Sequence, residues 1–167
     1  GMIPDCVPDV MKELRILSLE IPRMPKDPPS EFADTWHYPY LSVCATSTHD
    51  MSPLRAWWRE DRGVTQRFWN QVLGRQGEAP ADCTPDISRS IIMMHLQSAS
   101  MLAILPLQDY LSLKPELCLA DPEKERINVP AISPFYWRFR MKPTLESPIN
   151  DDITEYIHGL VRKCGRK

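Results

Sequence analysis

The sequence predicts an α/β domain with a small parallel sheet, and two observations support this. First, three apolar segments have the composition of strands that are covered on both faces, at residues 16–21, 41–50 and 101–105. Second, segments with helical periodicity separate the later strands, and this order implies parallel strands with right-handed crossovers. Three strands cannot close a barrel, which takes eight strands and about 250 residues. The chain is therefore either a small open α/β domain or the last part of something larger.

The helices are placed by apolar spacing and by end signals. Apolar residues at helical spacing predict helices over residues 8–14, 54–61, 65–73, 85–97, 107–113 and 151–163. The first of them is expected to bury Val10, Met11 and Leu14. Thr84 followed by Pro85 is a strong start signal for the fourth. Asp109, just after the third strand, is expected to be a helix-start residue.

Composition excludes several classes of protein. The 167 residues are 43% hydrophobic and 25% charged, as in ordinary globular domains, and the 17 prolines predict long ordered connections. A net charge of -2 argues against a nucleic-acid surface, and no segment reaches the roughly 18 apolar residues of a membrane span. The five cysteines and four histidines have neither disulfide nor metal-ligand spacing. A reduced cytoplasm without a bound metal is the simplest expectation.

The most informative stretch is residues 41–50, a strand candidate that ends in Thr48, His49 and Asp50. In α/β barrels the catalytic groups lie where strands give way to loops. Asp50 could instead cap the helix that starts near Leu54. The residues alone favour the cap, because Asp is common at helix starts.

Five motifs occur in order along the chain. They are Ser-Thr-His-Asp at 47–50, Leu-Arg-Ala-Trp-Trp at 54–58, Ala-Ile-Leu-Pro-Leu-Gln-Asp at 103–109, Arg-Ile-Asn-Val-Pro at 126–130 and Tyr-Trp-Arg-Phe-Arg at 136–140. Together they resemble the C-terminal part of the 4-α-glucanotransferases of glycoside hydrolase family 77, which include amylomaltases and plant disproportionating enzymes. The residues after the His-Asp pair are similar to the larger, plant-cytosol-like branch.

The resemblance implies a fold and a reaction. Residues 1–167 would be the C-terminal portion, with about three parallel strands plus helices, of an incomplete TIM (β/α)8 barrel. The family performs a retaining double displacement on α-1,4-glucan without a cofactor. Its nucleophile lies on an earlier strand, and its acid/base glutamate lies just before the stretch matched by Ile3 and Pro4. Both would belong to an upstream part of the same enzyme.

The resemblance also assigns site residues. Asp50 matches the family's second aspartate, which binds the distorted sugar and stabilises the transition state, and His49 matches the neighbouring imidazole. This reverses the preference for a helix cap. Trp36 and Tyr38 in the long connection over residues 22–39 are candidate sugar contacts, since loops of that length are usually functional. Asn128 would line the same cleft, with a turn-forming Asn as the alternative.

Two hypotheses follow. The chain is either part of a cytoplasmic 4-α-glucanotransferase acting on maltose, maltodextrin or glycogen, or a non-catalytic carbohydrate-binding or structural α/β unit. The expected partners are an α-glucan and the upstream part of the enzyme, without nucleic acid or membrane. We expect the isolated chain to be inactive and to self-associate, because a partial sheet leaves apolar faces and edges uncovered.

Overall fold

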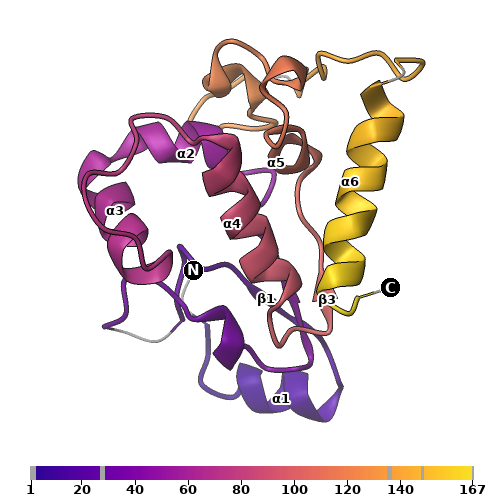
Figure 1. Ribbon diagram of the computed structural model, residues 1–167. Helices are drawn as coiled ribbons and strands as arrows, with labels where there is room; N and C mark the ends of the chain where they lie inside the picture. Colours follow the sequence, from indigo (N-terminus) through magenta and orange to yellow (C-terminus); the bar gives the residue numbers. More distant parts are fainter. Residues whose placement is uncertain (1–2, 27–28, 135–136, 148, 167) are drawn as a thin grey trace.

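The computed structural model has a three-stranded parallel sheet with helices around it (Figure 1). The residues it describes are 3–26, 29–134, 137–147 and 149–166. The strands are β1 (Ser18–Glu20), β2 (Ser42–Cys44) and β3 (Leu102–Ala103), in the order β1-β2-β3. Ser18 pairs with Ser42, and Val43 pairs with Leu102. The predicted α/β fold with three parallel strands is confirmed, although each strand is shorter than its apolar segment.

The helices lie close to where apolar spacing placed them. They are α1 (Val7–Glu13), α2 (Leu54–Glu60), α3 (Arg62–Arg67), α4 (Pro85–Leu96), α5 (Leu107–Leu111) and α6 (Ile149–Lys163). A π-helical turn, η2 (Phe68–Val72), continues α3, and short 3-10 helices occur at η1 (Thr35–His37), η3 (Pro115–Leu117) and η4 (Pro122–Glu125). The Thr84 side chain accepts a hydrogen bond from the Ile87 N–H, which confirms the predicted start of α4. Tyr136, in the last of the five motifs, lies outside the described residues.

Helix α4 is the central element of the packing (Figure 1). On one side, Ile87 and Ile91 join an aromatic core with Trp57, Trp58 and Phe68 from α2 and η2. A second core contains Ile92 and Leu96 of α4 with apolar residues of α5 and α6, including Leu111, Ile153 and Leu160. The same helix covers β2, where the Cys44 Sγ lies 3.5 Å from the His95 carbonyl oxygen and 3.1 Å from the Ser98 Oγ. One face of the sheet is therefore closed by α4.

The opposite face of the sheet is open. Leu19, Val43 and Leu102 pair across the three strands and share this face. Leu19 and Leu102 are exposed, and so is Ile104, at 60%. The prediction of strands buried on both faces is therefore wrong for this side, because no described element packs on it. Burial was also wrongly predicted for α1, where Val10 is 46% exposed and the C-cap residue Leu14 is 62% exposed.

We expect the isolated chain to self-associate through this open face, because contiguous exposed apolar side chains favour association. The double substitution Leu102→Lys with Ile104→Lys should lower the mass seen by light scattering toward that of the 19.3 kDa monomer. Ile132→Lys, at an exposed apolar residue of the segment after η4, is the control and should leave the association unchanged. A wild-type chain that is monomeric at high concentration would contradict this expectation.

None of the helices within the described residues is both long and apolar enough to cross a membrane.

Candidate active site

The candidate site is the loop over residues 45–53, which leaves the carboxyl end of β2. Strand β2 ends at Cys44, five residues before His49, so the predicted strand end at Asp50 is wrong. Residues 45–47 are nevertheless buried, and the chain emerges from the interior at Thr48. His49 and Asp50 then stand at the tip of the loop with their side chains 54% and 47% exposed. Both are within reach of a ligand at the carboxyl edge of the sheet.

Arg23 holds the two ends of this loop together. It follows β1, and its Nε donates to the Thr46 carbonyl oxygen at 3.1 Å while its Nη2 donates to the Ser52 carbonyl oxygen. Burial lowers the pKa of Arg23 to about 10, against the opposing effect of the negative charges of Asp109 and Glu60. The guanidinium therefore remains charged at neutral pH. One buried cation thus binds both backbone ends of the loop.

Asp109 holds the same two ends from the other side. Its carboxylate accepts hydrogen bonds from the Thr46 hydroxyl and, at 2.9 Å, from the Leu54 N–H. The side chain is fully buried, and desolvation raises its pKa despite these two hydrogen bonds and the nearby charge of Arg23. The loop is therefore closed at its stem by a buried arginine and a buried aspartate. This arrangement restricts where the tip can lie.

Asn128 fixes the tip of the loop. Its backbone N–H donates to the His49 carbonyl oxygen at 3.1 Å, and its side-chain Nδ2 donates to the Asp50 Oδ1 at 2.6 Å. The His49 Nε2 lies 3.4 Å from the same Asp50 oxygen, and the His49 ring packs against Trp137 with centroids 5.1 Å apart. His49, Asp50 and Asn128, predicted to share a site, are brought together in the structure. A carboxylate held in this way presents hydrogen-bond acceptors in a fixed direction.

Asp50 is not a helix cap. Helix α2 starts at Leu54, its N-cap is Pro53, and the N–H of Leu54 is bound by Asp109. The cap alternative that the sequence left open for Asp50 is therefore wrong. Asp109 lies in the first turn of α5, as expected, and in addition caps α2 from 55 residues away.

A cavity of about 440 Å³ adjoins the tip of the loop. It lies between the loop after β2 and the segment after β3. Its lining residues include His49, Met51, Ile104, Leu107, Gln108 and Phe139. The walls are mostly apolar and the polar groups are few, as is usual for sites that bind small molecules. The described residues contain no group of three or more His, Cys, Asp or Glu side chains that could hold a metal ion.

A family comparison gives the chemical context of this site. Residues 1–146 match the profile of glycoside hydrolase family 77, which is described as 4-alpha-glucanotransferase. The chain belongs to this family.

Relatives in the 4-alpha-glucanotransferase family agree with this assignment. The chain is 46% identical over 167 residues to the 4-alpha-glucanotransferase DPE2 of Oryza sativa subsp. japonica, covering 99% of this chain and 18% of that protein. It is 33% identical over 153 residues to the 4-alpha-glucanotransferase of Chlamydia muridarum, covering 87% of this chain and 28% of that protein. The chain therefore spans less than a third of the length of these two relatives.

Solved structures of amylomaltases share the fold. The amylomaltase from Streptococcus agalactiae in complex with acarbose has a TM-score of 0.73 at 15% identity, over 99% of this chain and 30% of that one. The amylomaltase from Corynebacterium glutamicum has a TM-score of 0.61 at 13% identity, over 99% of this chain and 28% of that one. At these identities the likeness concerns the fold.

Trp36 and Tyr38 lie away from His49, Asp50 and Asn128. The Thr35 and Tyr40 carbonyl oxygens accept hydrogen bonds from the Ala99 and Met101 N–H groups, so their segment lies beside the residues that enter β3. The residues that enter β3 lie at the amino edge of the sheet, whereas the loop that carries Asp50 starts at the carboxyl edge. The prediction is corrected for a topological reason: a connection between parallel strands starts at the carboxyl edge and must end at the amino edge.

Burial gives a second reason for Tyr38. Its side chain is only 6% exposed, and this burial raises the pKa of its hydroxyl, so the ring is not accessible to a sugar. Trp36 is exposed and lies in η1. From this connection, Arg23 at its start reaches the stem of the candidate-site loop. Its position directly after β1 is the sequence signal that could have identified it.

We expect Asn128→Ala to loosen the tip of the loop, because it removes the side-chain hydrogen bond to Asp50 and keeps the backbone bond to His49. Amide hydrogen exchange over residues 47–51 should become faster, while the free energy of unfolding should fall by no more than about 1 kcal/mol at this exposed contact. Asn70→Ala is the control, since it removes a side-chain hydrogen bond in another loop, from the Asn70 Nδ2 to the Arg75 carbonyl oxygen. Equal exchange rates in the two variants would contradict the role of Asn128.

Proposed function

We propose that the chain, residues 1–167, is the C-terminal part of the catalytic (β/α)8 barrel of a 4-α-glucanotransferase. The complete enzyme transfers α-1,4-glucan units between maltodextrins or glycogen. Family membership and three parallel strands with an amylomaltase-like fold support this proposal. The observation that carries the site assignment is Asp50, an accessible carboxylate at the carboxyl edge of the sheet whose loop is held at both its stem and its tip. Catalytic groups of α/β barrels occupy this edge.

In this proposal the reaction is a retaining double displacement. A carboxylate attacks the anomeric carbon while an acid protonates the leaving oxygen. The same group, now a base, then deprotonates the incoming sugar hydroxyl, whose oxygen attacks the anomeric carbon and displaces the carboxylate. We assign these two carboxylates to the upstream part of the enzyme. Asp50 accepts hydrogen bonds from hydroxyls of the bound glucosyl ring, and these bonds strengthen as positive charge develops on the ring. His49 contacts the same hydroxyls, and Asn128 orients Asp50.

The substrate and the compartment are part of the proposal. A solved relative, the Streptococcus agalactiae amylomaltase, was determined with acarbose bound, which supports an oligosaccharide ligand. All five cysteines are free and three of them are buried, an arrangement suited to the reducing cytoplasm.

The proposed activity is tested by incubating the complete protein with maltotriose. We expect glucose and maltodextrins longer than maltotriose to appear together. Hydrolysis without longer products would overturn the transferase assignment. Binding of maltotriose without any turnover would support the alternative of a non-catalytic carbohydrate-binding unit.

We expect the isolated 167-residue chain to form no products from maltotriose. An oxocarbenium-like path needs an acid and a nucleophile on the two sides of the scissile bond, and the proposal places both outside this chain. Chromatography of the products against a protein-free blank measures this. Longer maltodextrins formed by the isolated chain would show that a nucleophile lies within it.

A further inference from the structure

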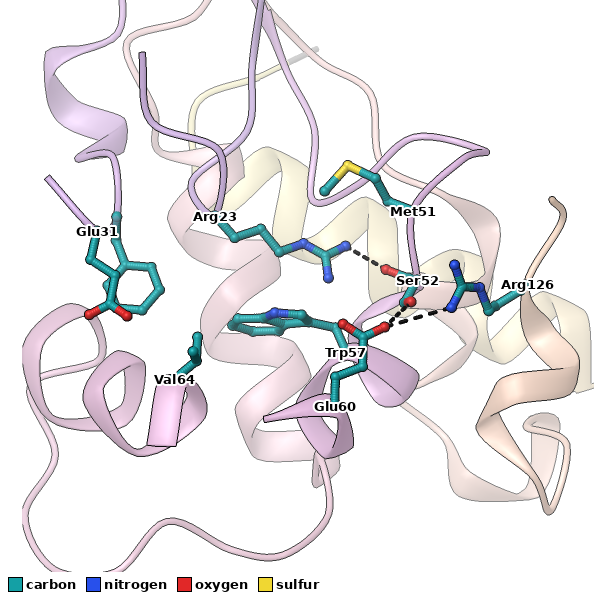
Figure 2. A pocket seen from close by; sticks show the side chains of 9 residues that line it. Arg23, Glu31, Met51, Ser52, Trp57, Glu60, Val64 and Arg126 are labelled. Carbon is teal, nitrogen blue, oxygen red and sulfur yellow. Dashed lines mark hydrogen bonds and ion pairs between the residues drawn. The ribbon is translucent and has the colours of Figure 1, made fainter. Parts of the chain in front are cut away.

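A second cavity, of about 480 Å³, has Met51 and Ser52 of the candidate-site loop in its lining (Figure 2). Met51, which follows Asp50 in the chain, lines both cavities. The walls of this second cavity come from four parts of the chain: the connection between β1 and β2, the candidate-site loop, helices α2 and α3, and the segment after η4. Its lining residues include Arg23, Phe32, Trp57, Glu60, Val64 and Arg126. The volume is in the usual range for sites that take small organic ligands, roughly 300 to 1,000 Å³.

The same two segments shape both cavities. On the segment after η4, Arg126 lines the second cavity, Ile127 lines the first, and Asn128 binds Asp50. On the opposite loop, Met51 lines both cavities and Ser52 lines the second. The two cavities are therefore neighbours that share Met51, the residue after Asp50.

The lining of the second cavity combines an apolar floor with polar walls. Trp57, Phe32 and Val64 supply the apolar part, and the Arg23 guanidinium lies 5.0 Å from the centroid of the Trp57 ring. The Glu60 carboxylate accepts a hydrogen bond from the Ser52 hydroxyl and lies 3.8 Å from the Arg126 Nη1 (Figure 2). Such a mixture suits a ligand that has both apolar faces and hydroxyl groups.

The charges of the cavity select a neutral ligand. Arg23 and Arg126 line the cavity together with Glu31 and Glu60, and their partners just outside it, Arg67 on Glu31 and Glu123 on Arg126, add one charge of each sign. The positive and negative charges therefore balance, so that neither a phosphate nor a metal ion is favoured. The Arg126 Nε is buried and has no hydrogen-bond partner among the described residues. Sugar hydroxyls both donate and accept, so they can serve arginine donors and glutamate acceptors together.

We propose that this cavity is a subsite for a glucosyl unit of the α-glucan, beside the loop that carries Asp50 and sharing Met51 with the first cavity. The inference rests on the proposed function and extends it, because it places two parts of one glucan chain in the two cavities that share Met51. Arg126 and Glu60 are the polar residues that hold the sugar in this subsite.

The test is a titration of the 167-residue chain with maltotriose, at a dilution where light scattering shows the monomer, followed by NMR of its methyl and indole groups. Val64 and the Trp57 indole report on the second cavity, and Ile104 and the Trp137 indole report on the first cavity and on His49. We expect saturable shifts at Val64 and Trp57. Arg126→Met and Glu60→Gln should each weaken the affinity read at Val64 by about fivefold or more and leave that read at Ile104 unchanged.

Arg59→Met is the matched control. Arg59 is an exposed arginine of α2 that pairs with Asp82 outside the cavity, so the affinity read at Val64 should not change. Shifts at Ile104 and Trp137 without shifts at Val64 and Trp57 would overturn the subsite and leave the proposed function standing. Absence of shifts at all four reporters would overturn the subsite as well, while the maltotriose assay of the complete protein decides the function separately. Shifts at Val64 with inorganic phosphate and none with maltotriose would identify an anion site instead.

Discussion

Asp50→Asn in the complete enzyme is expected to lower kcat for glucan transfer by about 100-fold or more, the usual effect of removing a group that stabilises the transition state. The substitution keeps the size of the side chain and one carbonyl oxygen, but removes the negative charge that, in the proposed mechanism, faces the developing positive charge of the sugar. The side chain is half exposed, so the free energy of unfolding should change by less than about 0.5 kcal/mol. Initial rates with maltotriose and urea denaturation measure the two effects.

Two further variants make this test specific. Asp82→Asn, at an exposed aspartate paired with Arg59, should leave turnover unchanged. His49→Ala should cost less than Asp50→Asn, because the imidazole is one sugar ligand among several in the proposed site. Near-native turnover of Asp50→Asn would remove Asp50 from the catalytic residues.

Asp109→Ala is expected to lower the free energy of unfolding by about 2 to 5 kcal/mol, because each of two donors that lose their buried acceptor costs about 1 to 3 kcal/mol. The substitution leaves the Thr46 hydroxyl and the Leu54 N–H without their acceptor and deprives the buried Arg23 of a nearby negative charge. Equilibrium urea denaturation of the 167-residue chain measures this. Asp121→Ala, which removes an exposed N-cap from η4, is the control and should cost no more than about 1 kcal/mol.

The pH dependence of a second variant, Asp109→Asn, tests the same assignment. Burial raises the folded-state pKa of Asp109 above its ordinary value of 3.8, so the folded chain binds this proton more tightly than the unfolded chain does. Wild-type stability relative to Asp109→Asn should therefore fall as the pH rises from 3.8 through the folded-state pKa. A difference in stability that does not change with pH, together with a loss below about 1 kcal/mol for Asp109→Ala, would contradict the role given to this carboxylate.

The features that could be predicted from the sequence are those that depend on residues close together in the chain. The start of α4 depends on Thr84 and Pro85, which are adjacent, and His49 and Asp50 are marked by a short motif after an apolar segment. The hydrogen bonds that hold the loop were not predictable, because Arg23 and Asp109 lie 23 and 63 residues from Thr46 along the chain. Such contacts depend on which strands become neighbours in the sheet, and spacing along the chain does not record that.

The errors have physical causes as well. Trp36 and Tyr38 were expected at the site because their connection is long, but the direction of a parallel crossover takes its end to the far edge of the sheet. The open face of β3 was expected to be buried because an apolar segment looks the same whether or not something covers it. The sequence shows that Ile104 is apolar, but only the fold shows that its side chain is exposed, because no described element packs on this face.

The hydrogen bond from the Leu54 N–H to Asp109 also orders events during synthesis. Helix α2 cannot receive its cap until the ribosome has added the 55 residues that separate the two partners. At about 5 to 20 residues per second this takes roughly 3 to 11 seconds, and the segment around Asp109 must also leave the exit tunnel. During that interval the loop with His49 and Asp50 lacks one of the two groups that close its stem. The candidate site therefore matures only when α5 docks, so a nascent chain stalled before Asp109 would carry the His-Asp motif in an unfinished loop.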